Sequence, residues 1–162
     1  MKALKNLHGL LQSSHSYPGP CRHPCQHEAD GHPEERFGED GLREVVQGYV
    51  DAWERGDVDA LAARLAEDAV FAMPPEPTWF RGQGAIAAFL RATPMREDYR
   101  WRVIPTSANG QPAFAHYIWV EKQNAFVPEG VAVLTLDGDK IAELTVFRDP
   151  ELFERFGLPA RL

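Results

Sequence analysis

One stretch near the C-terminal end decides the fold: residues 131–150 read VAVLTLDGDKIAELTVFRDP. Its two apolar runs, residues 131–136 and 140–147, have the length and the β-branched content of strands. Asp137-Gly138 between them is a two-residue hairpin signal. Asp149-Pro150 is a helix start, with a cap residue followed by proline at the first helical position. The stretch therefore predicts an antiparallel hairpin that leads into a terminal helix.

Two further strands precede this hairpin. Residues 99–103 alternate large apolar side chains with Arg100 and Arg102, which is typical of a strand buried on one face. Asn109-Gly110 then supplies a tight turn into a second apolar run over residues 114–120. Four consecutive strands joined by short turns predict an antiparallel meander.

Helices come before the meander. Apolar side chains recur at helical spacing between Leu42 and Trp53, with Asp40 as the expected N-cap and Gly56 as the stop. Asp57 is placed to cap a second helix, whose apolar face we expect to include Leu65. Helices on one side of an antiparallel sheet are typical of an α+β fold.

The segment between these helices and the meander is irregular. Residues 69–73 predict a short strand that ends at Pro74-Pro75, and a third helix is expected from Gly82 to Pro94. Several prolines and Trp79 lie between them, so we expect a stiff segment at the mouth of a pocket.

The elements together predict a cone: a curved, mostly antiparallel sheet wrapped over N-terminal helices, with a pocket between them. We expect this α+β domain to span residues 41–162. Residues 1–40 are rich in Ser, Pro and Gly and poor in core residues, so we expect a disordered tail.

The tail also carries a group of thiols and imidazoles. These side chains suit zinc, but their spacing is loose and the second half of a finger motif is missing. The alternatives are a zinc site and a tail that is merely rich in these residues; we favour the tail and expect no metal and no cofactor. The residues are Cys21, His23, Cys25, His27 and His32.

Composition excludes several function classes. The 162 residues carry a net charge of −7 without a block of Lys or Arg, which argues against a nucleic-acid partner. No apolar run approaches the length that crosses a bilayer, so no membrane partner is expected. Two cysteines do not make a disulfide framework, and a cytoplasmic location follows as the expectation.

Several motifs resemble a known family. Residues 49–61, YVDAWERGDVDAL, look like the opening of SnoaL-like (polyketide-cyclase-like) domains of the nuclear-transport-factor-2-like superfamily. Further pieces resemble the C-terminal SnoaL-like domain of certain extracytoplasmic-function sigma factors. These pieces are residues 73–75 (MPP), 78–82 (TWFRG), 108–113 (ANGQPA), 134–143 (LTLDGDKIAE), 147–150 (FRDP) and 156–159 (FGLP).

The resemblance implies the cone-shaped fold and a small-molecule pocket. It departs from the sigma factors in one respect: only about forty residues precede the domain, and they are neither basic nor helical in pattern. We therefore expect no promoter-binding regions in this chain, which is either free-standing or a remnant of a longer protein.

The resemblance also indicates where catalytic carboxylates would lie. Steroid-isomerase-like relatives carry their base just before a proline, where this chain has Met73. Epoxide-hydrolase-like relatives carry an aspartate on the last strand, where this chain has Val146. A thioether and an alkyl group cannot transfer a proton, so both of these mechanisms are expected to be closed to this chain.

Four other polar residues remain as candidates. His116 lies on the strand face that Phe114 and Ile118 share and could act as a general acid or base; a structural role is the alternative. We expect Glu143 to face outward, on the face of Ile141, and Asp51 to be solvated. Tyr117 stays open between a hydrogen bonder in the pocket and a surface aromatic.

The expected ligand is a small apolar molecule, and a homodimer is expected through the open outer face of the sheet, where Phe147 lies. The leading hypothesis is a ligand-binding or regulatory module. The alternatives are a small isomerase, cyclase or hydrolase with His116 as acid/base, and a dimerisation domain whose cone is filled by its own side chains. The expected pocket residues are Tyr49, Trp53, Met73, Trp79, Phe89, Trp101, His116 and Val146.

Overall fold

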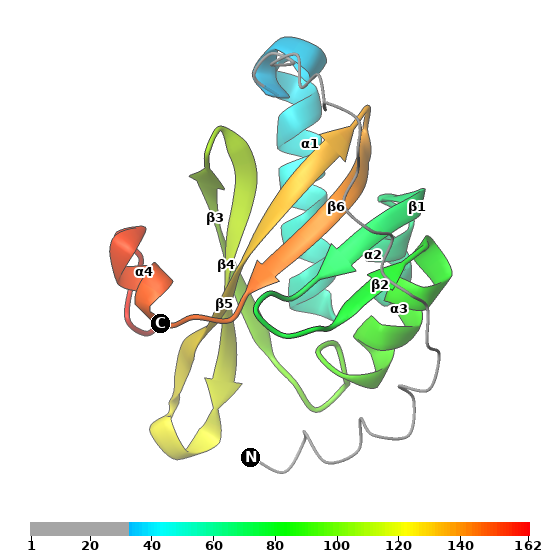
Figure 1. Cartoon of the computed structure of the whole chain (residues 1–162). Coiled ribbons are helices and arrows are strands. Elements are labelled where there is room, and N and C mark those ends of the chain that lie inside the picture. The colour runs from blue at the N-terminus through cyan, green and yellow to red at the C-terminus, as the bar shows by residue number, and fades with distance from the viewer. Residues whose placement is uncertain (1–32) are drawn as a thin grey trace. The chain divides into compact units, whose positions relative to one another are not determined.

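The computed structural model describes residues 33–162 (Figure 1). A six-stranded sheet with the order β2-β1-β6-β5-β4-β3 dominates it. All neighbouring strands are antiparallel except β1 and β6, which are parallel. The strands are β1 (Leu65–Ala72), β2 (Trp79–Arg81), β3 (Trp101–Ala108), β4 (Gln111–Val120), β5 (Ala125–Asp137) and β6 (Lys140–Phe147).

The predicted α+β class and the predicted meander are confirmed by strands β3 to β6. The expected disorder of residues 1–32 and the zinc alternative at Cys21, His23, Cys25, His27 and His32 lie outside the described residues, so they stay predictions. Residues 33–40 of the expected tail belong to a helix. Four α-helices occur in residues 33–162: α1 (Pro33–Arg55), α2 (Val58–Ala62), α3 (Gln83–Ala92) and α4 (Glu151–Arg155).

Two helix ends differ from the prediction. Helix α1 begins at Pro33 rather than after Asp40, because proline fits the first turn of a helix, where its missing N–H costs nothing. The Asp57 cap is confirmed, since its carboxylate accepts from the Ala60 N–H at 2.9 Å. However, α2 ends at Ala62 and Leu65 begins β1, so Leu65 is not on that helix.

The turns follow from their residues. Asn109 and Gly110 both have positive φ, 52° and 75°, as a two-residue hairpin turn requires. In the last hairpin Asp137 pairs with Lys140, so the turn residues are Gly138 and Asp139, one position later than predicted. The predicted cap at Asp149 is present: its carboxylate accepts from the Glu151 N–H at 3.0 Å, just before α4.

The segment after the prolines is more ordered than expected. Residues 79–81 form the short strand β2, in which Trp79 pairs with Ala72 of β1. Phe80 faces the core beside Phe71, so Trp79 points to the opposite face, where 48% of it is exposed. The expectation that Trp79 lines the pocket is therefore wrong, because strand alternation sends its side chain outward.

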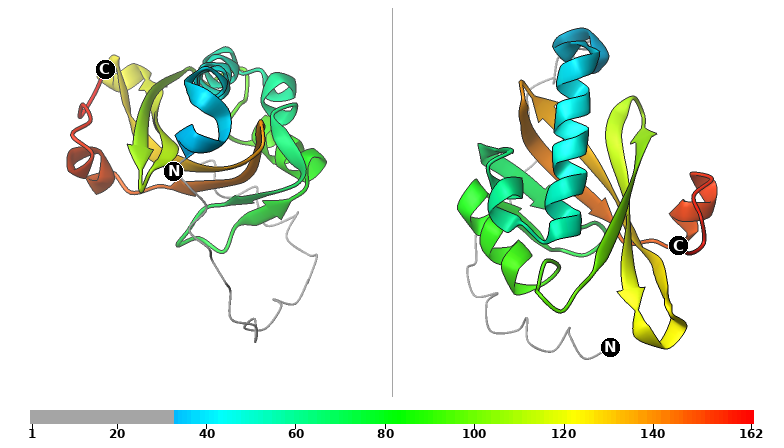
Figure 2. Two further views of the ribbon diagram at one scale, coloured as in Figure 1. Left: turned by 90° about the horizontal axis from the view of Figure 1, so that it is seen from above. Right: turned by 180° about the vertical axis from the view of Figure 1, so that it is seen from behind.

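The main core lies between the sheet and the first three helices. Figure 2 shows α1 lying along the inner side of the curved sheet, with α2 and α3 beside it. Tyr49, Trp53, Leu61 and Leu90 bring the helices into contact with inner side chains of the strands, such as Phe114. These residues are almost fully buried, which is typical of a domain core.

A second, smaller cluster covers part of the outer face. Phe153 of α4 packs edge-on against Tyr117, with ring centroids 5.1 Å apart, over Ala115 and Val131. The chain end continues this cover, because Leu162 and Phe126 exchange two backbone hydrogen bonds of 2.9 and 3.0 Å. The homodimer prediction assumed an open outer face. Over β4 and β5 this face is covered by α4 and the chain end.

Two large apolar side chains of the strands remain exposed on the outer face, Trp79 of β2 and Phe147 of β6. Phe147 is 37% exposed, as the prediction of an outward aromatic required. The homodimer itself stays a prediction, now restricted to this narrower surface.

Strand β3 forms one edge of the sheet. On the side away from β4, the Val103 N–H donates to the carboxylate of Glu54 on α1, at 3.1 Å. Two residues further along the same edge, Pro105 has no N–H to offer. The edge is therefore joined to helix α1 by a side chain rather than by another strand.

Candidate functional site

A cluster of aromatic rings with a buried histidine lies between α1 and the sheet. His116 of β4 is 3% exposed and sits with its ring centroid 4.5 Å from that of Trp53. Trp53 packs edge-on against Trp101 of β3 at 5.4 Å, and Tyr49 contacts Phe114 at 4.2 Å. The side chains that were predicted to line the pocket therefore contact one another.

Tyr49 and His116 form the polar centre of this cluster. The Tyr49 hydroxyl and the His116 Nε2 share a hydrogen bond of 3.2 Å. Burial lowers the pKa of His116 to about 3 and raises the pKa of Tyr49 above its ordinary value. Both groups are therefore neutral at pH 7, and neither has a charged partner in this cluster.

The cluster also contains the buried indole N–H of Trp53. Its Nε1 is buried and has no hydrogen-bond partner, the one such side-chain nitrogen or oxygen found in the described part of the chain. An unpaired buried N–H costs about 1–3 kcal/mol. The Trp53 N–H still acts on the Tyr49 hydroxyl, because the interaction with Trp53 opposes the rise of the Tyr49 pKa that burial causes.

Of the other predicted pocket residues, Met73 and Val146 lie at the margin of the core, and Phe89 is buried within it. Met73 and Val146 are half-buried against it, and Val146 faces inward beside Ala132. Phe89 belongs to a separate stack with Phe80, with centroids 4.5 Å apart. Met73 and Val146 both pack against the core, and neither side chain can transfer a proton.

The structure also decides the remaining candidates. Tyr117 lies on the outer face, where its hydroxyl donates to the Pro159 carbonyl at 2.9 Å, so it is neither a pocket residue nor a surface aromatic. Glu143 is exposed, as expected. Ile141, however, lies in the core and not on the face of Glu143, because an irregular register beside Ala142 shifts the alternation.

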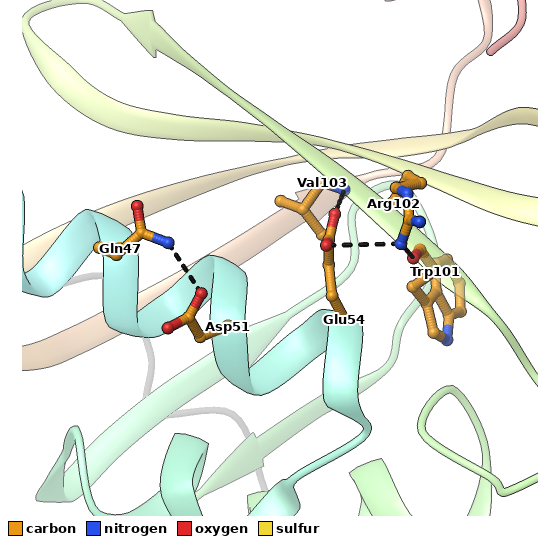
Figure 3. Close-up of polar contacts among 6 residues, drawn as sticks. All are labelled: Gln47, Asp51, Glu54, Trp101, Arg102 and Val103. Atoms are coloured by element: carbon orange, nitrogen blue, oxygen red, sulfur yellow. Dashed lines mark hydrogen bonds and ion pairs between the residues drawn. The ribbon is translucent and has the colours of Figure 1, made fainter.

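Asp51 is solvated, as predicted, on the outer side of α1. Its carboxylate accepts from Gln47 at 2.7 Å (Figure 3). It also pairs with Arg55 at 3.7 Å. One turn later on the same helix, Glu54 turns toward the sheet edge. Its two oxygens are taken by the Val103 N–H at 3.1 Å and by Arg102 at 3.5 Å. Glu54 therefore has a structural role.

An open groove of about 360 Å³ lies next to the aromatic cluster, where α1 ends and β3 begins. Its apolar wall consists of Met95, Tyr99, Trp101, Trp119 and Phe126. Gly56 and six charged residues complete the lining: Glu54, Arg55, Arg96, Glu97, Arg100 and Arg102. Of the eight predicted pocket residues only Trp101 lines this groove.

Trp101 separates the groove from the buried cluster. One side of the residue faces the groove, and its ring contacts Trp53 and, at 6.3 Å, His116. The Trp101 Nε1 donates to the Pro94 carbonyl at 2.7 Å, which holds the ring in this position. A molecule in the groove therefore meets Trp101 and not His116.

Three arginines lie over aromatic rings of the groove. Arg100 lies 4.5 Å from the Trp119 ring and Arg102 lies 5.3 Å from the Phe126 ring. Arg96 lies 5.5 Å from the Tyr99 ring. Contacts of this kind place cationic groups beside flat apolar surfaces.

Sequence reasoning missed this groove. Arg100 and Arg102 look like the solvent side of a half-buried strand, and they are indeed more than half exposed. The alternation of arginines with Tyr99 and Trp101, followed by Trp119 on the next strand, was the available signal. In the described part of the chain, no group of three or more His, Cys, Asp or Glu side chains could hold a metal ion.

Residues 46–144 match the profile of the SnoaL-like domain, which covers more than half of the chain. The chain belongs to the SnoaL-like domain family. The resemblance noted in the motifs is confirmed over most of the described region. None of the helices between residues 33 and 162 has the length and apolarity that crossing a bilayer requires.

This SnoaL-like chain is also similar to a curated bacterial protein. It is 31% identical over 121 residues to the ECF RNA polymerase sigma factor SigG of Mycobacterium tuberculosis, in two strains. The similarity covers 74% of this chain and 32% of the relative, so the chain spans about a third of the curated relatives it matches. The predicted likeness to a sigma factor of this class is confirmed.

Solved structures confirm the NTF2-like fold. An NTF2-like protein of unknown function from Mesorhizobium loti aligns with a TM-score of 0.59 and 19% identity, over 73% of this chain and 97% of that one. An LEH-like epoxide hydrolase of M. tuberculosis aligns at 0.54 and 18%, over 72% and 90%. A protein described as a polyketide cyclase, from Xanthomonas campestris, aligns at 0.52 and 25%, over 73% and 96%.

Proposed function

We propose that this domain is a ligand-binding module of regulatory type, which holds a ring-shaped, largely apolar molecule in the groove and does not transform it. One observation carries the proposal: the groove presents an aromatic wall, whereas the buried histidine lies behind Trp101. Binding and acid–base chemistry are thereby separated in space.

The aromatic wall suits a flat guest. Trp119 and Phe126 meet edge-on at 5.1 Å, and Tyr99 and Trp101 meet edge-on at 6.4 Å. Rings of this kind offer large contact areas for stacked or edge-on guests. A volume of about 360 Å³ lies in the range of small-molecule sites.

Absence of turnover is supported by the side chains at three positions. Met73 and Val146 supply no carboxylate where the related enzymes are expected to carry one. Glu54, which does line the groove, already has both oxygens engaged. The regulatory part of the proposal is supported by the similarity to a sigma factor.

The enzyme alternative has one observation in its favour. His116 and Tyr49 share a buried hydrogen bond, and the buried Trp53 N–H lies in the same cluster. A substrate could use all three only if Trp101 moved aside. The dimerisation alternative is favoured by the close packing of the predicted pocket residues.

Binding should be measured with a neutral fluorescent ring compound, phenylnaphthylamine. We expect Trp119→Ala to weaken its binding about tenfold, because the ring of Trp119 forms part of the groove wall. Trp79→Ala is the matched control: it removes the same ring from the outer face, outside the groove, and should leave the affinity unchanged.

The same experiment includes a screen for turnover of steroid enones, terpene epoxides and polycyclic polyketides. Saturable turnover that His116→Ala abolishes in a folded protein would establish the enzyme alternative instead. No binding at all, together with a dimer in sedimentation, would leave the dimerisation alternative.

A further inference from the structure

We infer that the molecule held in the groove carries an acid group on its ring system, and that Arg100 is the residue that binds this group. The inference rests on the proposed ligand-binding function and names the chemical class of the ligand. It starts from charge: the groove is lined by four arginines and two glutamates, an excess of positive charge in a chain whose net charge is −7. A local cationic site in an acidic protein selects anions.

Arg96 and Arg102 are held by hydrogen bonds to carboxylates, and Arg55 is held by an ion pair. Arg96 holds Asp98 through two hydrogen bonds of 2.9 and 3.0 Å. Arg102 contacts both Glu54 and the Trp101 carbonyl, at 3.5 and 3.4 Å. Arg55 pairs with Asp51, one turn earlier on α1 and outside the groove.

Arg100 and Arg55 each have one ion pair, but Arg100 also lies over a ring of the groove, that of Trp119. The acidic partner of Arg100 is Glu121, at 3.6 Å, and both side chains are largely exposed. A guanidinium has five N–H donors in a planar fork that matches a carboxylate or phosphate. Most of the donors of Arg100 are therefore available to a ligand.

The position of Arg100 is nevertheless defined. Its guanidinium lies 4.5 Å from the ring of Trp119, and the Trp119 Nε1 donates to the same Glu121 carboxylate at 2.7 Å. Glu121 thus connects the arginine to the aromatic wall. A ring that lies against Trp119 brings an acid group on its edge within reach of Arg100.

Glu121 should affect the binding of an anionic ligand in the opposite direction to Arg100. Its carboxylate repels an incoming anion while it holds Arg100 in place. Removing the charge of Arg100 should therefore weaken the binding of an anionic ligand, and removing the charge of Glu121 should strengthen it. The two substitutions are predicted to change the affinity for an anion in opposite directions. A loss of packing would weaken binding in both variants, so the pair of variants distinguishes charge recognition from packing.

The test compares two fluorescent probes with nearly the same rings. Anilinonaphthalene sulfonate carries a permanent negative charge, and phenylnaphthylamine carries none. We expect the full chain to bind the sulfonate more tightly at low salt. Arg100→Gln should weaken sulfonate binding about fivefold, and Glu121→Gln should strengthen it by about the same factor, as is typical of exposed charge pairs. Neither change should alter binding of the neutral probe by more than about twofold.

Arg81→Gln is the matched control, because Arg81 pairs with Asp68 at 3.4 Å, has a similar exposure and lies on the outer face, far from the groove in the strand order. It should change neither affinity. Added salt should weaken sulfonate binding by wild type but not by Arg100→Gln.

The outcomes separate this inference from the proposed function. If the neutral probe binds and the sulfonate binds no better, or if Arg100→Gln and Arg81→Gln have the same effect, the acid group is refuted while ligand binding stands. If neither probe binds, ligand binding in the groove and the acid group are both refuted.

Discussion

Trp53→Ala should lower the free energy of unfolding by about 3–5 kcal/mol, as deletion of large core aromatics does. Trp53 is 4% exposed and contacts Tyr49, Trp101 and His116, so alanine leaves a cavity that these rings cannot easily fill. Urea denaturation followed by circular dichroism measures the loss. The size of the effect reports whether the interior is packed, as described above, or is an open pocket.

Trp79→Ala is the control, because this tryptophan is 48% exposed on the outer face. We expect it to cost less than about 1 kcal/mol, as surface substitutions usually do. If Trp53→Ala also lowered the free energy of unfolding by less than about 1 kcal/mol, the rings around Trp53 would not be closely packed against one another. The interior would then be a ligand cavity, and the groove would be only its entrance.

Lowering the pH from 7 to 5 should cost the domain about 2 kcal/mol of stability through His116 alone. Its pKa is lowered by burial to about 3 in the folded protein, against an ordinary value of about 6.5 in the unfolded chain. Between these values the unfolded state binds the proton and the folded state does not. The contribution of His116 is therefore complete above pH 6.5 and falls as the pH drops toward 3.

His116→Gln tests this expectation, since glutamine can still bond to Tyr49 but does not titrate in this range. The difference in unfolding free energy between pH 7 and pH 5 should be smaller by about 2 kcal/mol in this variant. His116 is the single histidine of residues 33–162, and the titratable group that contacts it is Tyr49. Equal pH dependence in both proteins would show that the imidazole is open to protonation and would support the enzyme alternative.

The strands and turns were predictable because their signals are local. The meander follows from apolar alternation and from turn residues such as Asn109 and Gly110, whose positive φ values are cheap for those residue types. Helix starts were harder, because Pro33 and Asp40 are both valid start signals and local chemistry does not choose between them. Strand β2 has only three residues, which is too short to show a period.

The site was predicted only in part. Tyr49 and His116 were both expected inside, and they meet across 67 residues of sequence. Whether such rings line a cavity or fill it depends on the distance between α1 and the sheet, which no periodicity encodes. Arg100 was correctly expected to be exposed, but its position over Trp119 arises from the pairing of β3 with β4.

The contact between Glu54 and Val103 has a consequence for the behaviour of the protein at high concentration. A sheet edge with free N–H groups can recruit strands from other molecules and grow into fibres. At the β3 edge, one such group is occupied by the Glu54 carboxylate and the next is absent because the residue is Pro105. The opposite edge, β2, offers only three residues. Both edges of the sheet are therefore poor templates for aggregation. Helix α1, which carries Tyr49 and Trp53, also blocks the pairing of β3 with strands of other molecules.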